Sequence, residues 1–163
     1  MRRQTTSGTP VIIVTLLVCA WLEVLPLPDA VTFLRPAWLL LAMIYWTIAL
    51  PHRIGVVWAA LVGLFQDVLT GTVLGQHALA MVVVVYIAQS VYKRMRVFPP
   101  LQQSAVVFML AGVASLISFQ VQDIAGRAHV SPLVMLAGAV SSAILWRPVL
   151  HALRWVRRRL LVR

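Results

Sequence analysis

Charged residues are scarce in this sequence. They make up 11% of its 163 residues, whereas an ordinary soluble domain carries about 25%. Hydrophobic residues account for 61%, which leaves too little polar surface to cover a water-soluble globule of this length. The composition therefore excludes a soluble enzyme and predicts a single all-α domain, residues 1–163, embedded in a membrane.

Cysteine and acidic residues are scarcer still. The single Cys19 excludes an internal disulfide and a cysteine metal cluster. Four acidic residues are spread over separate segments, so their spacing does not pair a general acid with a general base. The HExxH metal motif, the GxSxG turn, the GxxxxGK phosphate loop and the GxGxxG turn are all absent. We expect no catalytic residue, no metal and no cofactor.

Positive charge, in contrast, is in excess. A net charge of +10 in a soluble protein would indicate a nucleic-acid partner. Here the 14 basic residues form short clusters between long uncharged runs, without a basic stripe or a platform of base-stacking aromatic residues. This pattern argues against nucleic acid and is typical of the cytoplasmic loops of a membrane protein.

The uncharged runs predict the membrane spans, because a helix needs about 20 residues to cross the hydrocarbon core of a bilayer. The second run is short, so it either begins early, with Arg35 reaching outward, or forms a hairpin with the third. Four spans, with that hairpin re-entering the membrane, are the alternative to six. The six predicted spans are residues 10–25, 37–50, 54–70, 75–92, 101–122 and 132–146.

The positions of the basic residues predict the orientation. With both termini in the cytoplasm, twelve of the fourteen lie on that side, and only Arg35 and Arg127 lie outside. The four acidic residues fall on or near the outer side. Residues 148–163 have the spacing of a basic amphipathic helix on the inner leaflet. The predicted cytoplasmic basic residues include Arg53, Lys93, Arg94, Arg96, Arg154, Arg157 and Arg158.

Small residues recur along two of the spans. Gly55, Ala59 and Gly63 follow one another at intervals of four in the third span, and Gly138 and Ser142 do so in the sixth. Such lines let helix backbones approach closely. We expect them to pack helices together, either within the chain or against a transmembrane helix of a partner.

Asp67 is the most conspicuous polar residue, since a charge facing lipid costs at least about 2.5 kcal/mol. The turn after it contains Gly71, Gly75, Gln76 and His77, and its glycines permit close backbone approach. Asp67 is interpreted either as a carboxylate that binds a ligand or partner at an outward pocket, or as a helix-end acid at the membrane interface that is hydrogen-bonded to loop amides or simply hydrated. The outer end of the fifth span is also polar, which adds a possible pocket wall.

Four stretches in the middle of the chain resemble one known family. They are RPAWLLL at 35–41, LPHRIGV at 50–56, GLFQDVLTG at 63–71 and LGQHAL at 74–79. The pattern G-L-x-x-D-x-x-x-G in the third stretch is the most specific. Together they are similar to MreD, the family of rod shape-determining membrane proteins. The likeness is close over residues 35–79, looser through residues 96–99, and elsewhere depends on size and span number.

This resemblance implies a non-enzymatic scaffold subunit of the bacterial cell-elongation (Rod) complex, located in the inner membrane. It implies direct binding to MreC, and action alongside the MreB filament, RodA and the class B transpeptidase partner of RodA in peptidoglycan synthesis. The family is also similar in fold to the substrate-binding subunits of energy-coupling-factor transporters. That likeness supports an alternative function, a transport or sensing subunit that binds a small molecule or lipid near Asp67.

Overall fold

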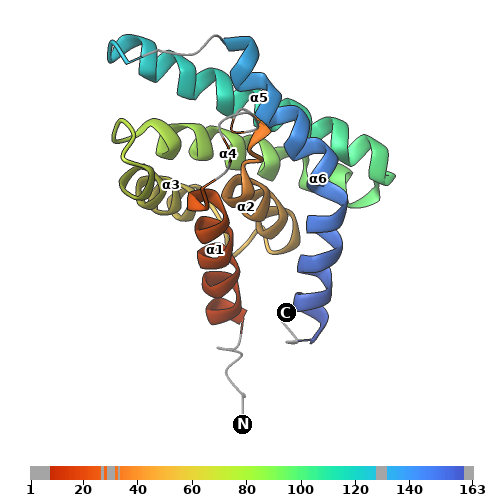
Figure 1. Ribbon diagram of the computed structural model, residues 1–163. Coiled ribbons are helices and arrows are strands. Elements are labelled where there is room, and N and C mark those ends of the chain that lie inside the picture. Colours follow the sequence, from red (N-terminus) through yellow and green to blue (C-terminus); the bar gives the residue numbers. More distant parts are fainter. Residues whose placement is uncertain (1–7, 27, 29–31, 33, 128–131, 160–163) are drawn as a thin grey trace.

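The computed structural model describes residues 8–26, 28, 32, 34–127 and 132–159 of the chain. Within these ranges the secondary structure is entirely helical, with six helices (Figure 1). This confirms the predicted all-α class for the described part of the protein. Asp29 and the last four residues of the predicted tail lie outside it. The helices are α1 (Gly8–Val24), α2 (Trp38–Ala49), α3 (Val56–Thr70), α4 (Gln76–Val97), α5 (Pro100–Ile124) and α6 (Pro132–Arg159).

The six helices fall into two length classes. α4, α5 and the described part of α6 are long and apolar enough to cross a membrane. α1, α2 and α3 are also apolar but have only 17, 12 and 15 residues, and 12 helical residues extend about 18 Å against a hydrocarbon core of about 30 Å. The chain is thus a membrane protein with three helices of spanning length among its described residues. Six full spans remain a prediction.

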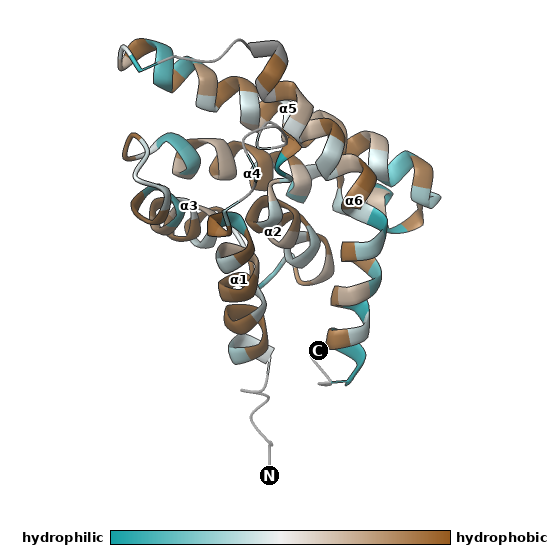
Figure 2. Ribbon diagram, in the orientation of Figure 1, coloured by the Kyte–Doolittle hydropathy of each residue, from teal (hydrophilic) through white to brown (hydrophobic). Residues whose placement is uncertain are grey.

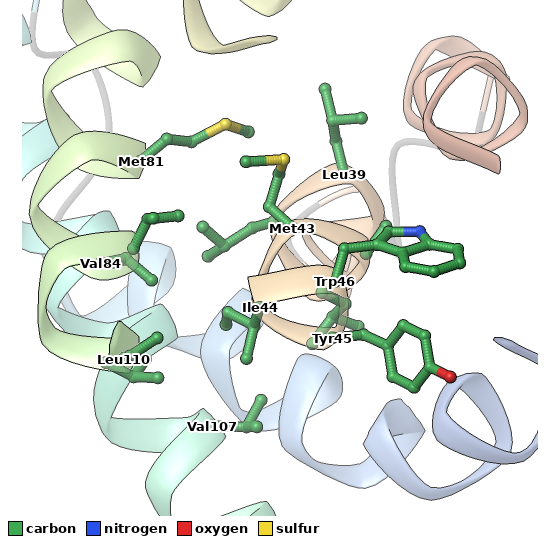
Figure 3. Packing of buried hydrophobic residues seen from close by; sticks show 14 of the residues in the cluster. Leu39, Met43, Ile44, Tyr45, Trp46, Met81, Val84, Val107 and Leu110 are labelled. Carbon is green, nitrogen blue, oxygen red and sulfur yellow. The ribbon is translucent and has the colours of Figure 1, made fainter. Parts of the chain in front are cut away.

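α2, the shortest of the described helices, lies at the centre of the molecule. Every residue from Leu39 to Thr47 is buried, and α2 contacts α1, α4 and α6. Figure 3 shows Val84 of α4 and Leu110 of α5 on the side of α2 that carries Ile44, whereas the Trp46 ring extends to the other side. A helix that is apolar on all faces is stable only when it is enclosed. The Trp46 indole, which needs a hydrogen-bond acceptor in such surroundings, donates to the Thr15 hydroxyl of α1 over 2.9 Å.

α6 differs from the expectation that the last span ends near Trp146 and that a separate helix follows Pro148. A single helix continues through Pro148 to Arg159. A proline inside a helix removes one backbone hydrogen bond. Leu150 and Leu153, two and five residues further on, are buried against the rest of the protein, and this packing holds the helix in line. Figure 2 shows hydrophobic residues over most helical surfaces and hydrophilic ones along the last turns of α6.

Successive helices run in alternating directions, so the connections gather at two ends. In Figure 1 the α3–α4 connection and the carboxyl end of α5 lie at the left, and the α4–α5 connection lies at the right. The end with the α4–α5 connection also contains the carboxyl ends of α2 and α6, and its exposed basic residues include Arg53, Lys93, Arg94, Arg96, Arg154 and Arg158. We call it the basic end. Glu23, Asp67 and Asp123 lie at the opposite, acidic end. The side of the membrane that each end faces remains a prediction.

Candidate functional site

Asp67 lies in the last turn of α3 and forms the cap of the next helix. Its side chain is almost fully buried, at 1% exposure. The carboxylate accepts hydrogen bonds from the backbone N–H of Gly75 at 2.8 Å and of His77 at 2.9 Å, and from the Thr72 hydroxyl at 3.2 Å. His77 Nδ1 lies 2.8 Å from the same carboxylate. An anion is favoured at a helix N-terminus because the first N–H groups of the helix have no partner within it.

The turn between α3 and α4 depends on its glycines. Gly71 ends α3 with φ of 66°, and Gly75 precedes α4 with φ of 94°. Both values lie in the left-handed region, which residues with a Cβ adopt at a cost in energy. The turn therefore brings the N–H groups of Gly75 and His77 back onto Asp67. This arrangement matches the second interpretation of Asp67, an acid at a helix end that is hydrogen-bonded to loop amides.

The small residues of α3 face α4. A Cβ placed on Gly63 would lie 2.6 Å from the backbone nitrogen of Ala78, a distance that atoms without a bond do not reach. Ala59, one turn earlier, is completely buried, and a Cβ on Gly55 would meet the Gln89 amide at 3.6 Å. The line of small residues thus allows the backbones of α3 and α4 to touch within the chain.

Gly138 and Ser142 of α6 also contact this same chain. The Ser142 hydroxyl donates to the Gly138 carbonyl at 2.7 Å and accepts from the Ala37 N–H at 3.0 Å. A Cβ on Gly138 would lie 3.0 Å from the Arg35 carbonyl oxygen. The pair therefore joins α6 to the segment that enters α2.

A cavity of about 670 Å³, here called the large cavity, lies at the acidic end between α3, α4, α5, α6 and the segment before α2. Gln76 and His77, two of the five residues predicted for a pocket, line it. Asp67, Gly71 and Gly75 are not among its described lining residues. The polar residues in its wall are Glu23, Thr32, Arg35, Gln66, Thr70, Thr72, Gln76, His77, Ser115, Ser118 and Gln122.

Sequence reasoning missed Gln66, Glu23 and Arg35 as members of this wall. Arg35 does not reach outward. Its guanidinium donates to the carbonyls of Glu23 and Leu25 at the end of α1, where the helix dipole favours a cation. The Glu23 carboxylate accepts from the N–H of Leu39 at 3.2 Å. Gln66 could have been noticed as an amide beside Asp67 in an otherwise apolar run. The sequence alone does not show which helices surround it.

The basic end contains a smaller cavity of about 310 Å³, lined in part by Arg96, Arg154 and Arg157. Arg96 donates to the carbonyls of Ile48 and Ala49 at 2.7–3.0 Å, so it caps the end of α2 as Arg35 caps the end of α1. Of the other predicted basic residues at this end, Arg53, Lys93, Arg94 and Arg158 are exposed, whereas Arg157 is half-buried. Among the described residues, no group of three or more His, Cys, Asp or Glu side chains is placed to hold a metal ion.

Comparisons with known proteins agree with the resemblance seen in the central stretches. The family model described as rod shape-determining protein MreD matches residues 4–156. A curated relative, the rod shape-determining protein MreD of Haemophilus influenzae, is 33% identical over 138 residues, which cover 85% of this chain and 85% of the relative. No solved structure matches. This chain therefore belongs to the MreD family of rod shape-determining membrane proteins.

Proposed function

We propose that the protein is a non-enzymatic scaffold of the Rod complex in the inner membrane. In this role it binds MreC and couples cytoplasmic MreB filaments to peptidoglycan synthesis by RodA and its transpeptidase partner. The observation that carries the proposal is the family match, which extends over nearly the whole chain. The arrangement of the polar residues supports it, because Asp67, Ser142 and Arg96 are each used to join helices of the body.

The surface for the MreC helix is proposed on the outward side of α3. Gly63 and Ser142 pack inside the chain and leave no close-approach surface at those positions. α3, in contrast, packs mainly on α4 and exposes Val57, Leu61 and Val68, with 60–73% of each side chain accessible. Their spacing of four and seven residues places them on one helix face. A partner helix at this face would bury large apolar side chains by van der Waals packing.

Site-specific photocross-linking tests both levels of this proposal. A photoreactive residue at Val57, Leu61 or Val68 should capture a co-expressed MreC homologue, whereas the equally exposed Met109 of α5 and Ile144 of α6 serve as matched controls. Capture at the controls and not at α3 would move the interface to another face. Absence of MreC at every position, together with failure to co-purify, would contradict the scaffold role itself.

The exposed basic residues provide a second contact in this proposal. Arg53, Lys93, Arg94 and Arg158 all lie exposed at one end of the molecule. Basic residues beside a membrane are attracted to anionic lipids by about 1 kcal/mol each, and they complement an acidic protein surface equally well. This end is therefore proposed to face the cytoplasm and to contact the filament or the inner leaflet.

A transport or sensing subunit is the second candidate, and the large cavity favours it. Its volume is within the range of about 300–1,000 Å³ that is common for ligand sites. Asp67, which the sequence suggested as a ligand-binding residue, instead accepts hydrogen bonds from the backbone N–H groups at the start of α4. Native mass spectrometry together with co-purification separates the two candidates. A stoichiometric ligand on a chain that does not bind MreC supports the second, whereas a chain that binds MreC, with or without a ligand in the cavity, supports the first.

A further inference from the structure

The wall of the large cavity contains two buried amides whose oxygens have no partner. Gln66 of α3 is 3% exposed and Gln76 of α4 is 2% exposed, and both line the cavity. In the described structure, neither Oε1 atom accepts a hydrogen bond. Buried amide oxygens in folded proteins are almost always hydrogen-bonded, because an unpaired one loses its hydration without compensation. Two such atoms in one cavity indicate a site that is completed by a bound group.

A third unpaired atom defines the chemistry of that group further. The Nε of Arg35, also in the cavity wall, is buried and has no acceptor. The two glutamine oxygens need N–H or O–H donors, and the arginine nitrogen needs an acceptor. Hydroxyl and amide groups supply both. An anion would meet two unpaired carbonyl-type oxygens, and a cation would meet the guanidinium.

The charged groups in the wall each have a hydrogen-bonded partner within the protein. Arg35 is held by the carbonyls at the end of α1, Glu23 accepts from the Leu39 N–H, and the His77 Nδ1 pairs with Asp67. The wall therefore does not require a charged ligand, and an uncharged one fits it. The remaining wall is apolar and includes Leu40, Met81, Ala111 and Ala139, which suits a hydrocarbon portion.

We propose that the large cavity binds one uncharged molecule that carries hydroxyl or amide groups on an apolar portion, with Gln66 and Gln76 as its binding residues. A lipid with a neutral sugar headgroup and a water-soluble polyol share this chemistry. The inference rests on the cavity alone. It is therefore independent of MreC binding, and failure of either proposal leaves the other intact.

The test uses the full chain in phosphatidylethanolamine nanodiscs that contain a small fraction of monoglucosyl diacylglycerol as the probe. Native mass spectrometry should find one glucolipid retained per wild-type chain. The double variant Gln66→Met, Gln76→Met should bind it about a hundredfold more weakly, since each of the two lost hydrogen bonds in a buried site weakens binding by about tenfold. Gln102→Met is the matched control, because Gln102 is exposed on α5 at the basic end.

A parallel sample with free glucose distinguishes the source of the ligand. If glucose displaces the glucolipid, the site recognises the headgroup and accepts a water-soluble polyol; if it does not, the lipid form is the ligand. Ala114→Leu, which introduces a larger side chain into the cavity wall, should also abolish retention without removing a polar group. It provides a second variant should the double substitution impair folding.

Two results would overturn the proposal. One is non-specific retention of the glucolipid. The wild-type chain would then retain no more glucolipid than phosphatidylethanolamine, or the wild type and both cavity variants would retain the same amount of glucolipid. The other is the absence of any ligand. Neither the wild type nor the double variant would then carry an adduct, glucose would leave both melting temperatures unchanged, and the double variant would melt at a higher temperature than the wild type. In that case water alone occupies the cavity, and the glutamines are unpaired polar groups without a ligand.

Discussion

Each end of the molecule contains buried glutamine side chains, and the two ends differ in whether these side chains are hydrogen-bonded. At the basic end, Gln103 is 6% exposed, donates to the carbonyls of Met95 and Phe98 at 2.9 and 3.0 Å, and accepts from the Trp146 indole at 3.3 Å. At the acidic end, the side-chain oxygens of Gln66 and Gln76 accept nothing in the described structure. The buried amide of the basic end is thus fully paired within the protein, whereas the amide oxygens at the acidic end are not.

The two ends are alike in one respect, because an arginine caps the end of a helix at each of them. Arg96 donates to the carbonyls that end α2, and Arg35 donates to those that end α1. Both ends therefore satisfy helix C-termini in the same way. The two ends differ in the wall of the large cavity, where the side-chain oxygens of Gln66 and Gln76 remain unpaired. A bound group that pairs such atoms adds to the stability of the folded protein.

The largest effect is expected from Gly63→Ala, which acts on the framework of the acidic end. The new Cβ would collide with the backbone of Ala78, so α3 and α4 must separate. We expect a loss of about 3 kcal/mol or more in the free energy of unfolding, measured as thermal unfolding in detergent. Gly112→Ala is the control, because its Cβ would lie 3.7 Å from Leu136, an ordinary contact. Equal melting temperatures for the two variants would contradict the close crossing of α3 and α4.

A Gln→Met substitution at each end tests the comparison directly. Gln103→Met leaves two carbonyls without a donor and the Trp146 N–H without an acceptor, so the free energy of unfolding should fall by about 2–3 kcal/mol. Gln66→Met removes an unpaired oxygen from the ligand-free protein, which should be neutral or stabilising. Thermal unfolding of delipidated samples provides the measurement. If both variants lose the same stability, the two ends do not differ as described.

Asp67→Asn weakens the cap between α3 and α4. The amide retains one oxygen acceptor but loses the charge that the first N–H groups of α4 and the His77 ring contact. The expected loss is about 1–2 kcal/mol. Asp123→Asn is the control, since Asp123 is an exposed acid at the same end. Hydrogen exchange should show faster opening of the first turn of α4 in the Asp67 variant alone. Unchanged protection there would rule out the capping role.

The smallest effect is expected from the surface charges of the basic end. Arg94→Gln together with Arg158→Gln removes two exposed cations, and each substitution should change the free energy of unfolding by about 0.5 kcal/mol or less. A melting temperature lowered as far as in Gln103→Met would mean that charge, rather than the buried amide, stabilises this end. The same variants in cells test whether these arginines help orient the chain, by reporter fusions to its C-terminus.

Much of the helical framework follows from local sequence. The uncharged runs predicted helices close to α1 through α5, because apolar length and proline positions act locally. Gly71 and Gly75 indicated a tight turn for the same reason. Pro148 suggested a break after the last span, but α6 continues through it. The packing of Leu150 and Leu153 outweighs one lost hydrogen bond.

The cavity residues were harder to predict. Gln66 and Asp67 are neighbours in the sequence, yet a helix turns about 100° per residue, so one faces the cavity and the other faces the start of α4. Sequence reasoning selected Asp67 because a charge among apolar residues is conspicuous. It passed over Gln66 because a neutral amide is not.

The amino-acid sequence alone determined the membrane class, the helix-forming segments, the gathering of positive charge and, through its central motifs, membership in the MreD family. These properties depend on composition and on residues close together in the chain. Only the tertiary structure decided that α2 is central, that Gly63 touches Ala78, and which polar groups find partners. The N–H of Ala37, for example, meets the Ser142 hydroxyl across 105 positions. Satisfaction of a buried polar group depends on such distant neighbours, and no local pattern specifies them.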